Sequence, residues 1–274
     1  MKSGSEPDFP ERESSTGNRA LTPISGTVYL VGAGPGAPDL LTVRAVRLLG
    51  EADIVFHDAL IGDGILSLAR KAELVAVGKR SGKHSTAQRF INKRLADAAH
   101  RYRTVVRLKG GDPMLFGRAH EEIAFLREKS IGVEVVPGVT AALAASAELG
   151  VSLTQRLLAR SVVFATPRTA EGAAPSGWEK AVAAADTAVL YMAAGEARSV
   201  KDALLRAGLS AATPVVAAEN VSLPERRLSK GILADLPALA ACSAGGPTLL
   251  LVGDVFREAC ITQDFLQKMS GIRA

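Results

Sequence analysis

The sequence predicts an α/β protein with two halves of similar size, and two observations lead to this prediction. Short runs rich in β-branched residues alternate with longer segments of helical period up to Leu149. This alternation is typical of a mostly parallel sheet with helices packed on its faces. The pattern then changes, and a loop-like segment rich in glycine, proline and alanine, Pro167–Gly177, separates the next two strand-like runs. We place the boundary between the halves near residues 137–155.

Five runs in the first half have the length and the β-branched content of buried strands. They span residues 27–32, 52–57, 73–77, 104–108 and 132–136. The segments between them carry apolar residues at helical spacing, which predicts five helices. These span residues 39–50, 62–70, 86–101, 117–129 and 140–149.

The second half contains five further strand-like runs and two helical segments. The runs are Ser161–Ala165, Ala188–Met192, Pro214–Glu219, Glu225–Gly231 and Pro247–Gly253. Helical spacing recurs at residues 195–207 and 232–241. We therefore expect a second α/β domain, and ligands often bind at the interface between two such domains.

The sequence predicts a tail at each end of the chain. Residues 1–25 are rich in serine, glutamate, proline and arginine, and they lack the apolar core of a secretory signal. The expected organisation is a disordered N-terminal tail at 1–25, an N-terminal domain at 26–138, a C-terminal domain at 139–260 and a C-terminal tail at 261–274.

The composition predicts a cytoplasmic globular protein. No run of 18 apolar residues lacks a charge or a breaker, so we expect no membrane span. Cys242 and Cys260 are the two cysteines, and neither lies in a Cys-x-x-Cys or Cys/His cluster, which disfavours a disulfide framework or a zinc site. The histidines show no metal-ligand spacing, so we expect no metal, and we interpret all four as structural or surface residues; they are His57, His84, His100 and His120.

The net charge of +5 is compatible with an acidic small molecule, nucleic acid or an anionic membrane surface. No block of five or more lysines and arginines is present, which disfavours nucleic acid.

A glycine-rich turn, Gly32–Ala37, follows the first strand and matches the dinucleotide-binding pattern G-x-G-x-x-A loosely. In a dinucleotide fold, backbone N–H groups of this turn would hold a pyrophosphate and Asp58 could bind ribose. Pro35 opposes this interpretation because it removes one N–H from the turn. From the turn alone, three interpretations stay open: a dinucleotide site, a site for another cofactor, and a tight structural turn.

A second motif, Val105–Arg118, follows a strand, turns on Gly-Gly-Asp-Pro and opens a helix. Three shorter motifs occur further along the chain, namely Val136–Ala141, Leu153–Arg156 and Tyr191-Met192. Together with the glycine-rich turn, these motifs resemble the tetrapyrrole (corrin/porphyrin) methylase family, and the resemblance runs from about residue 26 to residue 256. Within that family the chain is most similar to the members that methylate uroporphyrinogen III.

The resemblance implies two α/β domains with a cofactor cleft between them, in the tetrapyrrole methylase fold and not in a Rossmann fold. It implies S-adenosyl-L-methionine as cofactor, converted to S-adenosyl-L-homocysteine. A sulfonium cofactor has no phosphate, so the N–H that Pro35 lacks is not needed. On this interpretation the glycine-rich turn forms the floor of the cleft.

The resemblance also places cofactor contacts on several short stretches. The matching residues are Pro35, Gly110, Gly111, Asp112, Leu115, Thr140, Ala141, Met192, Val221 and Thr248. Glycines would let the chain lie close to the ligand, and Met192 could pack against a purine. Read without the resemblance, Asp112 is a turn residue before proline and Met192 is a core methionine.

The implied reaction is two methyl transfers to carbon atoms of uroporphyrinogen III, which give precorrin-2 for cobalamin or sirohaem biosynthesis. The resemblance gives Asp58 the role of general base and Lys79 that of proton donor, although Lys79 could equally be a surface lysine. The substrate carries eight carboxylates, which bidentate arginines suit. We assign Arg107, Arg118 and Arg156 to substrate binding or to site electrostatics.

Several stretches depart from the family pattern. Ala37 stands where the family usually has aspartate, Ala59 where it often has arginine, and Ala119-His120 where it commonly has two small residues. Thr166–Arg168 replaces a common Thr-Gly-His, and Gln155 replaces a frequent histidine. Several of these positions would lie near the tetrapyrrole, so the departures affect the assignment of the substrate more than that of the cofactor.

Three other functions compete with this one. The first is a methylase of the same family that acts on a later precorrin. The second is a nicotinamide-dependent oxidoreductase built on the glycine-rich turn. The third is a binding protein that keeps the cleft without turnover. The resemblance further implies a homodimer, with neither nucleic acid nor a membrane as a partner.

Overall fold

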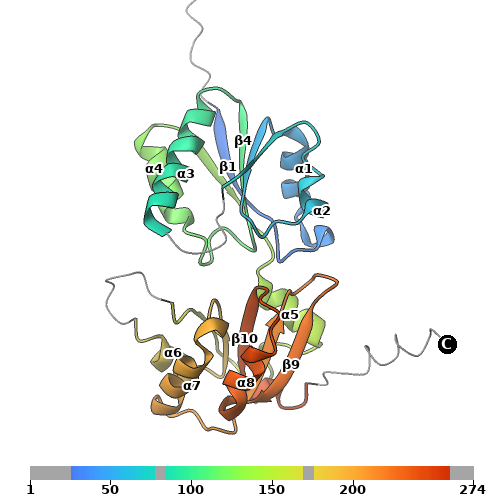
Figure 1. Ribbon diagram of the computed structural model, residues 1–274, viewed down its shortest axis with the longest axis vertical. Helices are drawn as coiled ribbons and strands as arrows, with labels where there is room; N and C mark the ends of the chain where they lie inside the picture. Colours follow the sequence, from blue (N-terminus) through green and yellow to red (C-terminus); the bar gives the residue numbers. More distant parts are fainter. Residues whose placement is uncertain (1–25, 78–83, 169–175, 260–274) are drawn as a thin grey trace, which may run out of the picture.

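The computed structural model describes residues 26–77, 84–168 and 176–259. Both expected tails and Lys79 lie outside these ranges. Within them, no helix is long and apolar enough to cross a membrane. Two five-stranded sheets form the framework, one in each half of the chain (Figure 1).

The first sheet is parallel throughout, as the alternation of strands and helices predicts. Its strand order is β3-β2-β4-β1-β5, and every neighbouring pair is parallel. The strands are β1 (Thr27–Gly32), β2 (Ile54–His57), β3 (Glu73–Ala76), β4 (Thr104–Lys109) and β5 (Gly132–Val136). Valine, leucine and isoleucine fill most of the buried positions, because both faces of this sheet are covered.

Helices cover both faces of the first sheet. They are η1 (Pro38–Leu40), α1 (Val43–Glu51), α2 (Asp63–Leu66), α3 (His84–Ala99) and α4 (Ala119–Glu128). Figure 1 shows α1 and α2 on one face and α3 and α4 on the other. A separate apolar cluster fills each interface, with Phe56 and Leu126 on the α3–α4 side and Leu49 and Ile65 on the α1–α2 side.

Most of the expected helices differ at their ends from those observed, and three of these differences in the first half have a local cause. The segment 39–50 divides into η1 and α1, because the Thr42 side chain accepts the N–H of Ala45 and begins a new helix. The segment 62–70 is α-helical only to Leu66, after which the backbone bonds have the three-residue spacing of successive turns. Helix α4 begins at Ala119, since Arg118 adopts a left-handed conformation with φ of 57°.

The second sheet is mixed, with strand order β6-β7-β10-β8-β9. The strands are β6 (Val162–Ala165), β7 (Thr187–Leu190), β8 (Pro214–Glu219), β9 (Arg227–Ile232) and β10 (Thr248–Gly253). Only the pair β6–β7 is parallel, and the other three pairs are antiparallel. All five expected strands are present, although β7 ends at Leu190, so Tyr191 and Met192 follow the strand.

The second sheet is also covered on both faces. Its helices are α5 (Ala141–Leu149), α6 (Trp178–Ala184), η2 (Ala194–Glu196), α7 (Ala197–Arg206), η3 (Leu233–Asp235), α8 (Leu236–Ala241) and η4 (Asp254–Phe256). Helices α6, α7 and α8 share one apolar cluster, and α5 shares the other with Phe256. The short helix α6 is a feature that the sequence analysis did not predict.

The connection Pro137–Thr140 leads from β5 into α5, which packs against the second sheet. This arrangement agrees with a domain boundary at residues 138–139, which stays a prediction.

The strand order of the first sheet places a crevice between β1 and β4. These strands are neighbours, but the helix after β1 covers one face and the helix after β4 covers the other. Their loops therefore diverge at the carboxyl ends of the strands, which is where open α/β sheets bind ligands. These carboxyl ends point toward the second half of the chain (Figure 1).

Candidate active site

Three glycine-containing loops, after β1, β4 and β5, pack backbone against backbone at this crevice. Gly111 N–H donates to Gly34 O at 2.7 Å, and Gly34 N–H donates to Gly111 O at 3.2 Å. A Cβ atom on Gly32 would lie 2.6 Å from Gly138 Cα, and one on Gly138 would lie 2.3 Å from Gly111 O. Such distances are too short for any side chain, so glycine is needed for the close approach.

The N–H groups of the glycine-rich turn are largely committed to protein acceptors. Ala33 N–H donates to Lys109 O, Gly34 N–H to Gly111 O, and Ala37 N–H to Ser222 Oγ. Pro35 has no N–H to offer. A pyrophosphate needs several free N–H groups at such a turn. The turn therefore does not suit a dinucleotide.

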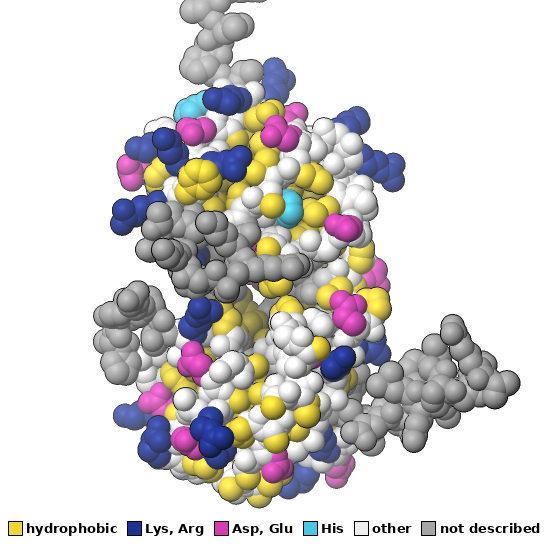
Figure 2. All heavy atoms as spheres, viewed as in Figure 1, with side chains coloured by type: hydrophobic (Ala, Val, Ile, Leu, Met, Phe, Trp, Pro, Cys, Tyr) yellow, Lys and Arg dark blue, Asp and Glu magenta, His cyan; other side chains and the backbone are white. Residues whose placement is uncertain are grey.

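A cavity of about 380 Å³ lies above these loops, between the two halves. In Figure 2 the surface is hollowed between the halves, and hydrophobic side chains line the visible part of the hollow. All ten residues expected to contact the cofactor contribute to the cavity wall. They are Pro35, Gly110, Gly111, Asp112, Leu115, Thr140, Ala141, Met192, Val221 and Thr248.

Asp112 braces two of the loops as well as lining the cavity. Its Oδ1 accepts the N–H of Met114 at 2.8 Å, and its Oδ2 accepts the N–H of Gly138 at 3.0 Å. The Asp112 carboxylate therefore both stabilises the turn and forms part of the cavity wall. Its hydrogen bond to Gly138 depends on the close packing of Gly138 against Gly111.

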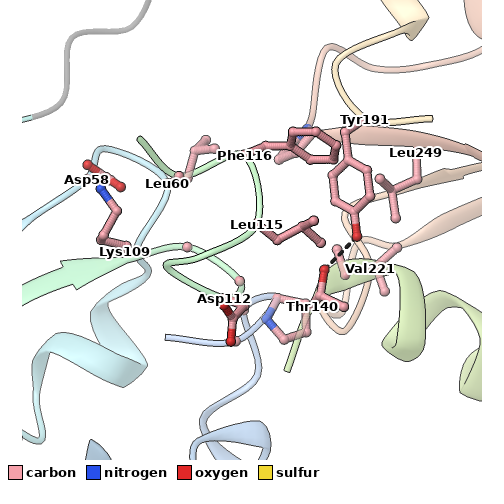
Figure 3. A pocket seen from close by; sticks show the side chains of 18 of the residues that line it. Asp58, Leu60, Lys109, Asp112, Leu115, Phe116, Thr140, Tyr191, Val221 and Leu249 are labelled. Carbon is pink, nitrogen blue, oxygen red and sulfur yellow. Dashed lines mark hydrogen bonds between the residues drawn. The ribbon is translucent and has the colours of Figure 1, made fainter. Parts of the chain in front are cut away.

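Tyr191 connects the wall residues of the two halves, and the sequence analysis did not single it out as a site residue. Its hydroxyl lies 2.5 Å from Thr140 Oγ1, drawn as the dashed line in Figure 3, and accepts the N–H of Ala142 at 3.3 Å. Its ring centroid lies 5.1 Å from that of Phe116. Burial raises the pKa of the Tyr191 hydroxyl, so it stays protonated at neutral pH. The available signal was its position beside Met192 in the Tyr-Met motif.

Unusual backbone conformations gather around the cavity. Phe116, Met192 and Asn220, all wall residues, have φ of 54°, 56° and 51°. Ser222, which accepts from the glycine-rich turn, has φ of 70°. Non-glycine residues in this region carry a free-energy cost, and such residues tend to cluster at functional sites.

Asp58 follows β2 and lies in the cavity wall with 32% of its side chain exposed. Its Oδ1 accepts a hydrogen bond from Arg107 Nη2 at 2.5 Å. The Arg107 side chain is 3% exposed and also donates to Glu122 Oε1 and to Leu108 O. Burial alone would lower the pKa of Arg107, but the Asp58 and Glu122 carboxylates raise it above the ordinary value.

The three arginines assigned to substrate binding or site electrostatics lie in three different environments. Arg107 is buried behind Asp58 and hydrogen-bonds it, a position that suits the assignment to site electrostatics better than direct contact with a substrate. Arg118 is exposed and pairs with Glu121 through Nε and Nη2, both at 2.7 Å. Arg156 is exposed in the segment 154–160, which lies outside the cavity wall.

The three histidines whose side chains the structure describes lie in different parts of the first half. His57 Nδ1 lies 3.1 Å from Asp58 O, and His100 and His120 are at other positions of the first half. The side chain of His84 lies outside the described residues. Among the described residues, no group of three or more histidine, cysteine, aspartate or glutamate side chains could hold a metal ion.

Comparison with known families gives one match that covers most of the chain. Residues 27–237 match the profile of the tetrapyrrole (corrin/porphyrin) methylases. Curated relatives include siroheme synthases. That of Pseudomonas putida strain F1 is 45% identical over 232 residues, and that of Chromobacterium violaceum is 44% identical over 237 residues. These matches cover 84% and 86% of this chain but 50% of each relative, so the chain spans about half the length of these relatives.

Solved structures with the same fold include uroporphyrin-III C-methyltransferase from Thermus thermophilus. Its native form has a TM-score of 0.74 and 38% identity, covering 85% of this chain and 94% of the other. Its complex with S-adenosylhomocysteine has a TM-score of 0.73 and 40% identity, covering 85% and 99%. A cobalt precorrin-4 methyltransferase has a TM-score of 0.73 at 26% identity, covering 84% and 95%.

Proposed function

The chain belongs to the tetrapyrrole (corrin/porphyrin) methylase family, and on this premise we propose that it transfers methyl groups from S-adenosylmethionine to carbon atoms of uroporphyrinogen III. The product of two transfers is precorrin-2. The observation that carries the proposal is the cavity wall, because all ten residues expected to contact the cofactor line it. The similarity to a C-methyltransferase that binds S-adenosylhomocysteine supports the same cofactor.

The residues present fit a sulfonium nucleoside. A Cβ atom built on Gly110 or Gly111 meets nothing within 4 Å, so the wall is open for a ligand along these two residues. Leu115, Met192 and Val221 offer apolar surface for a purine, and Thr140 and Thr248 bring hydroxyl groups. A ligand without phosphate suits this mostly apolar wall, whose glycine-rich turn has few free N–H groups.

Bound S-adenosylmethionine would supply the methyl group, and the chain would supply position, charge and proton transfer. The two halves would hold the accepting carbon in line with the methyl group, and positioning of this kind accounts for much of the rate in such reactions. The substrate transiently gains positive charge as a carbon–carbon bond forms. The Asp58 carboxylate, half-open to the cavity, would stabilise that charge and accept the departing proton.

Lys79 as proton donor and Arg118 and Arg156 as contacts for substrate carboxylates are parts of the proposal. So are a homodimeric assembly, a cytoplasmic location and the absence of nucleic-acid and membrane partners. The pathway served is sirohaem or cobalamin biosynthesis.

The test has two steps that separate cofactor from substrate. The purified protein is first titrated with S-adenosylmethionine by calorimetry, and uroporphyrinogen III is then added under anaerobic conditions while the absorbance spectrum is recorded. Binding followed by a new precorrin-like or isobacteriochlorin-like chromophore is the expected result. Binding without a new chromophore would move the substrate to a later precorrin, as for the cobalt precorrin-4 neighbour. No binding would overturn the proposal.

A further inference from the structure

A group of four charged side chains lies behind the Asp58 end of the cavity. Arg107 and Lys109 come from β4, Glu122 comes from α4, and Asp58 follows β2. Arg107 and Lys109 are two residues apart on one strand, so their side chains leave the sheet on the same face. In Figure 3, Lys109 and Asp58 lie together at the end of the cavity opposite Tyr191.

Glu122 is the residue that holds this group together. Its side chain is fully buried, and its Oε1 accepts from Arg107 Nε at 3.1 Å and from Lys109 Nζ at 3.2 Å. Its Oε2 accepts from Lys109 Nζ at 3.1 Å. Gln88, on α3, donates to Oε1 at 3.1 Å. One carboxylate therefore separates and fixes two buried cations that would otherwise repel each other.

The two cations have different positions relative to the cavity. Arg107 is behind the wall and reaches it through its hydrogen bond to Asp58. Lys109 is itself a wall residue although its side chain is only 4% exposed. A buried ammonium held by two bonds to one carboxylate can turn its remaining N–H toward a ligand in the cavity.

Building on the proposed methyl transfer, we propose that Glu122 is a positioning residue for the reaction, which fixes the Lys109 ammonium in the cavity wall and holds Arg107 against Asp58. Lys109 is then a second charged group that faces the ligand, beside Asp58. The two groups have opposite charge, so the site can face both the cationic reaction centre and an anionic group of a ligand.

The charges around Lys109 determine how the site responds to pH. Burial lowers the pKa of Lys109 and the Arg107 cation lowers it further, whereas Glu122 and Asp58 raise it. Arg118, which precedes α4, pairs with Glu121 of that helix, and Gln88 and Asn92 on α3 are uncharged. Removing the charge of Glu122 therefore lowers the pKa of Lys109 further, and the ammonium is lost at a lower pH.

The experiment is the pH dependence of single-turnover methyl transfer between about pH 6 and pH 10. Glu122→Gln is expected to lower the rate about tenfold or more at neutral pH and to move the alkaline loss of activity about one pH unit lower. Lys109→Arg keeps the cation at every pH tested and is expected to remove that alkaline loss. Affinity for S-adenosylhomocysteine, measured by calorimetry, should change little in Glu122→Gln, because Glu122 is not a wall residue.

Leu126→Ala is the matched control, because Leu126 is a buried apolar residue on the same helix. It should lower Tm without moving the alkaline limb of the pH profile, that is, the pH range in which activity is lost as the pH rises. A purely structural effect on α4 would give this result. An alkaline limb in Glu122→Gln equal to that of the wild type would overturn the inference. If Glu122→Gln does not fold, an unchanged limb in Lys109→Arg would overturn it instead. A wild-type chain that forms no methylated product would show that the proposed function has failed, and the inference with it.

Discussion

At the scale of single residues, the carboxylate of Asp58 can be tested separately from cofactor binding. It lies in the cavity wall and hydrogen-bonds Arg107, so replacement by the isosteric amide removes the charge and keeps the shape. Asp58→Asn should lower the methyl-transfer rate by about 100- to 10,000-fold, the range for loss of a general base. Affinity for S-adenosylmethionine, measured by calorimetry, should stay within a few-fold of the wild type.

The matched control for this change is Asp63→Asn, since Asp63 is exposed on α2 and is not a wall residue. It should leave the rate unchanged. A rate for Asp58→Asn equal to that of the control would remove Asp58 from the reaction.

The Tyr191 hydroxyl gives a second prediction at this scale. Tyr191→Phe keeps the ring against Phe116 and removes the hydroxyl that contacts Thr140 Oγ1 and Ala142 N–H. We expect a loss of about 0.5–1.5 kcal/mol in the free energy of unfolding, measured with urea. Affinity for S-adenosylhomocysteine should also fall, because Thr140 loses the partner that orients it.

Tyr29→Phe serves as the control for the loss of a hydroxyl. The Tyr29 hydroxyl makes no hydrogen bond within the part of the chain that the structure describes. Equal losses of stability and affinity in the two variants would show that the Tyr191 hydroxyl has no special role.

At the scale of elements, the three glycine-containing loops make a prediction about stability. Gly138→Ala would place a Cβ atom 2.3 Å from Gly111 O, and backbone on both sides leaves no room to relax. The cost should reach or exceed the roughly 1–3 kcal/mol typical of overpacking, measured as a change in the free energy of unfolding.

Gly110→Ala is the contrasting change, because a Cβ atom there meets nothing within 4 Å. Its stability should stay close to that of the wild type, whereas cofactor affinity should fall, since the new methyl group would project into open space at the cavity wall. Equal destabilisation by the two changes would contradict the loop packing described here.

The sequence alone was sufficient to predict the positions of the strands. It was not sufficient to predict how all of them pair or every helix that packs on them. All ten strands were predicted to within about two residues, because β-branched runs bounded by turns carry that signal locally. The antiparallel pairing of β10 with β7 and β8 was not predictable, since it joins segments far apart in the chain. Helix α6 was missed because it has seven residues and directly follows a segment rich in turn-forming residues.

The same distinction applies to the site. The wall residues were found because they belong to motifs, and the family resemblance located them. The packing of charged side chains around Glu122 and the contacts of Tyr191 were not predicted, because they depend on which strands and helices become neighbours. The burial of Arg107 could not be predicted for the same reason, since its place in a motif does not reveal that its side chain lies behind Asp58.

At the scale of the whole molecule, the cavity connects the two halves, so a ligand in it should stabilise both together. Besides the Pro137–Thr140 connection, the glycine-rich turn reaches the second half through Ala37 N–H, which donates to Ser222 Oγ at 3.0 Å. Ser222 N–H in turn donates to Glu148 Oε1 at 2.7 Å. A ligand that contacts Gly110 and Leu115 on one side and Met192 and Val221 on the other adds to this bridge.

We therefore expect S-adenosylhomocysteine to raise the Tm of the whole chain in a single transition. A ligand that binds only the folded state stabilises it by about 2.7 kcal/mol at 100 times its Kd, which is roughly 5–10 °C for a chain of this size. NAD at the same concentration should give no shift, because the N–H groups that would hold its pyrophosphate are already bonded within the protein. Calorimetric scans would decide the matter. Two separated transitions, with only one raised by the ligand, would mean that the halves respond independently and that the ligand binds within one of them.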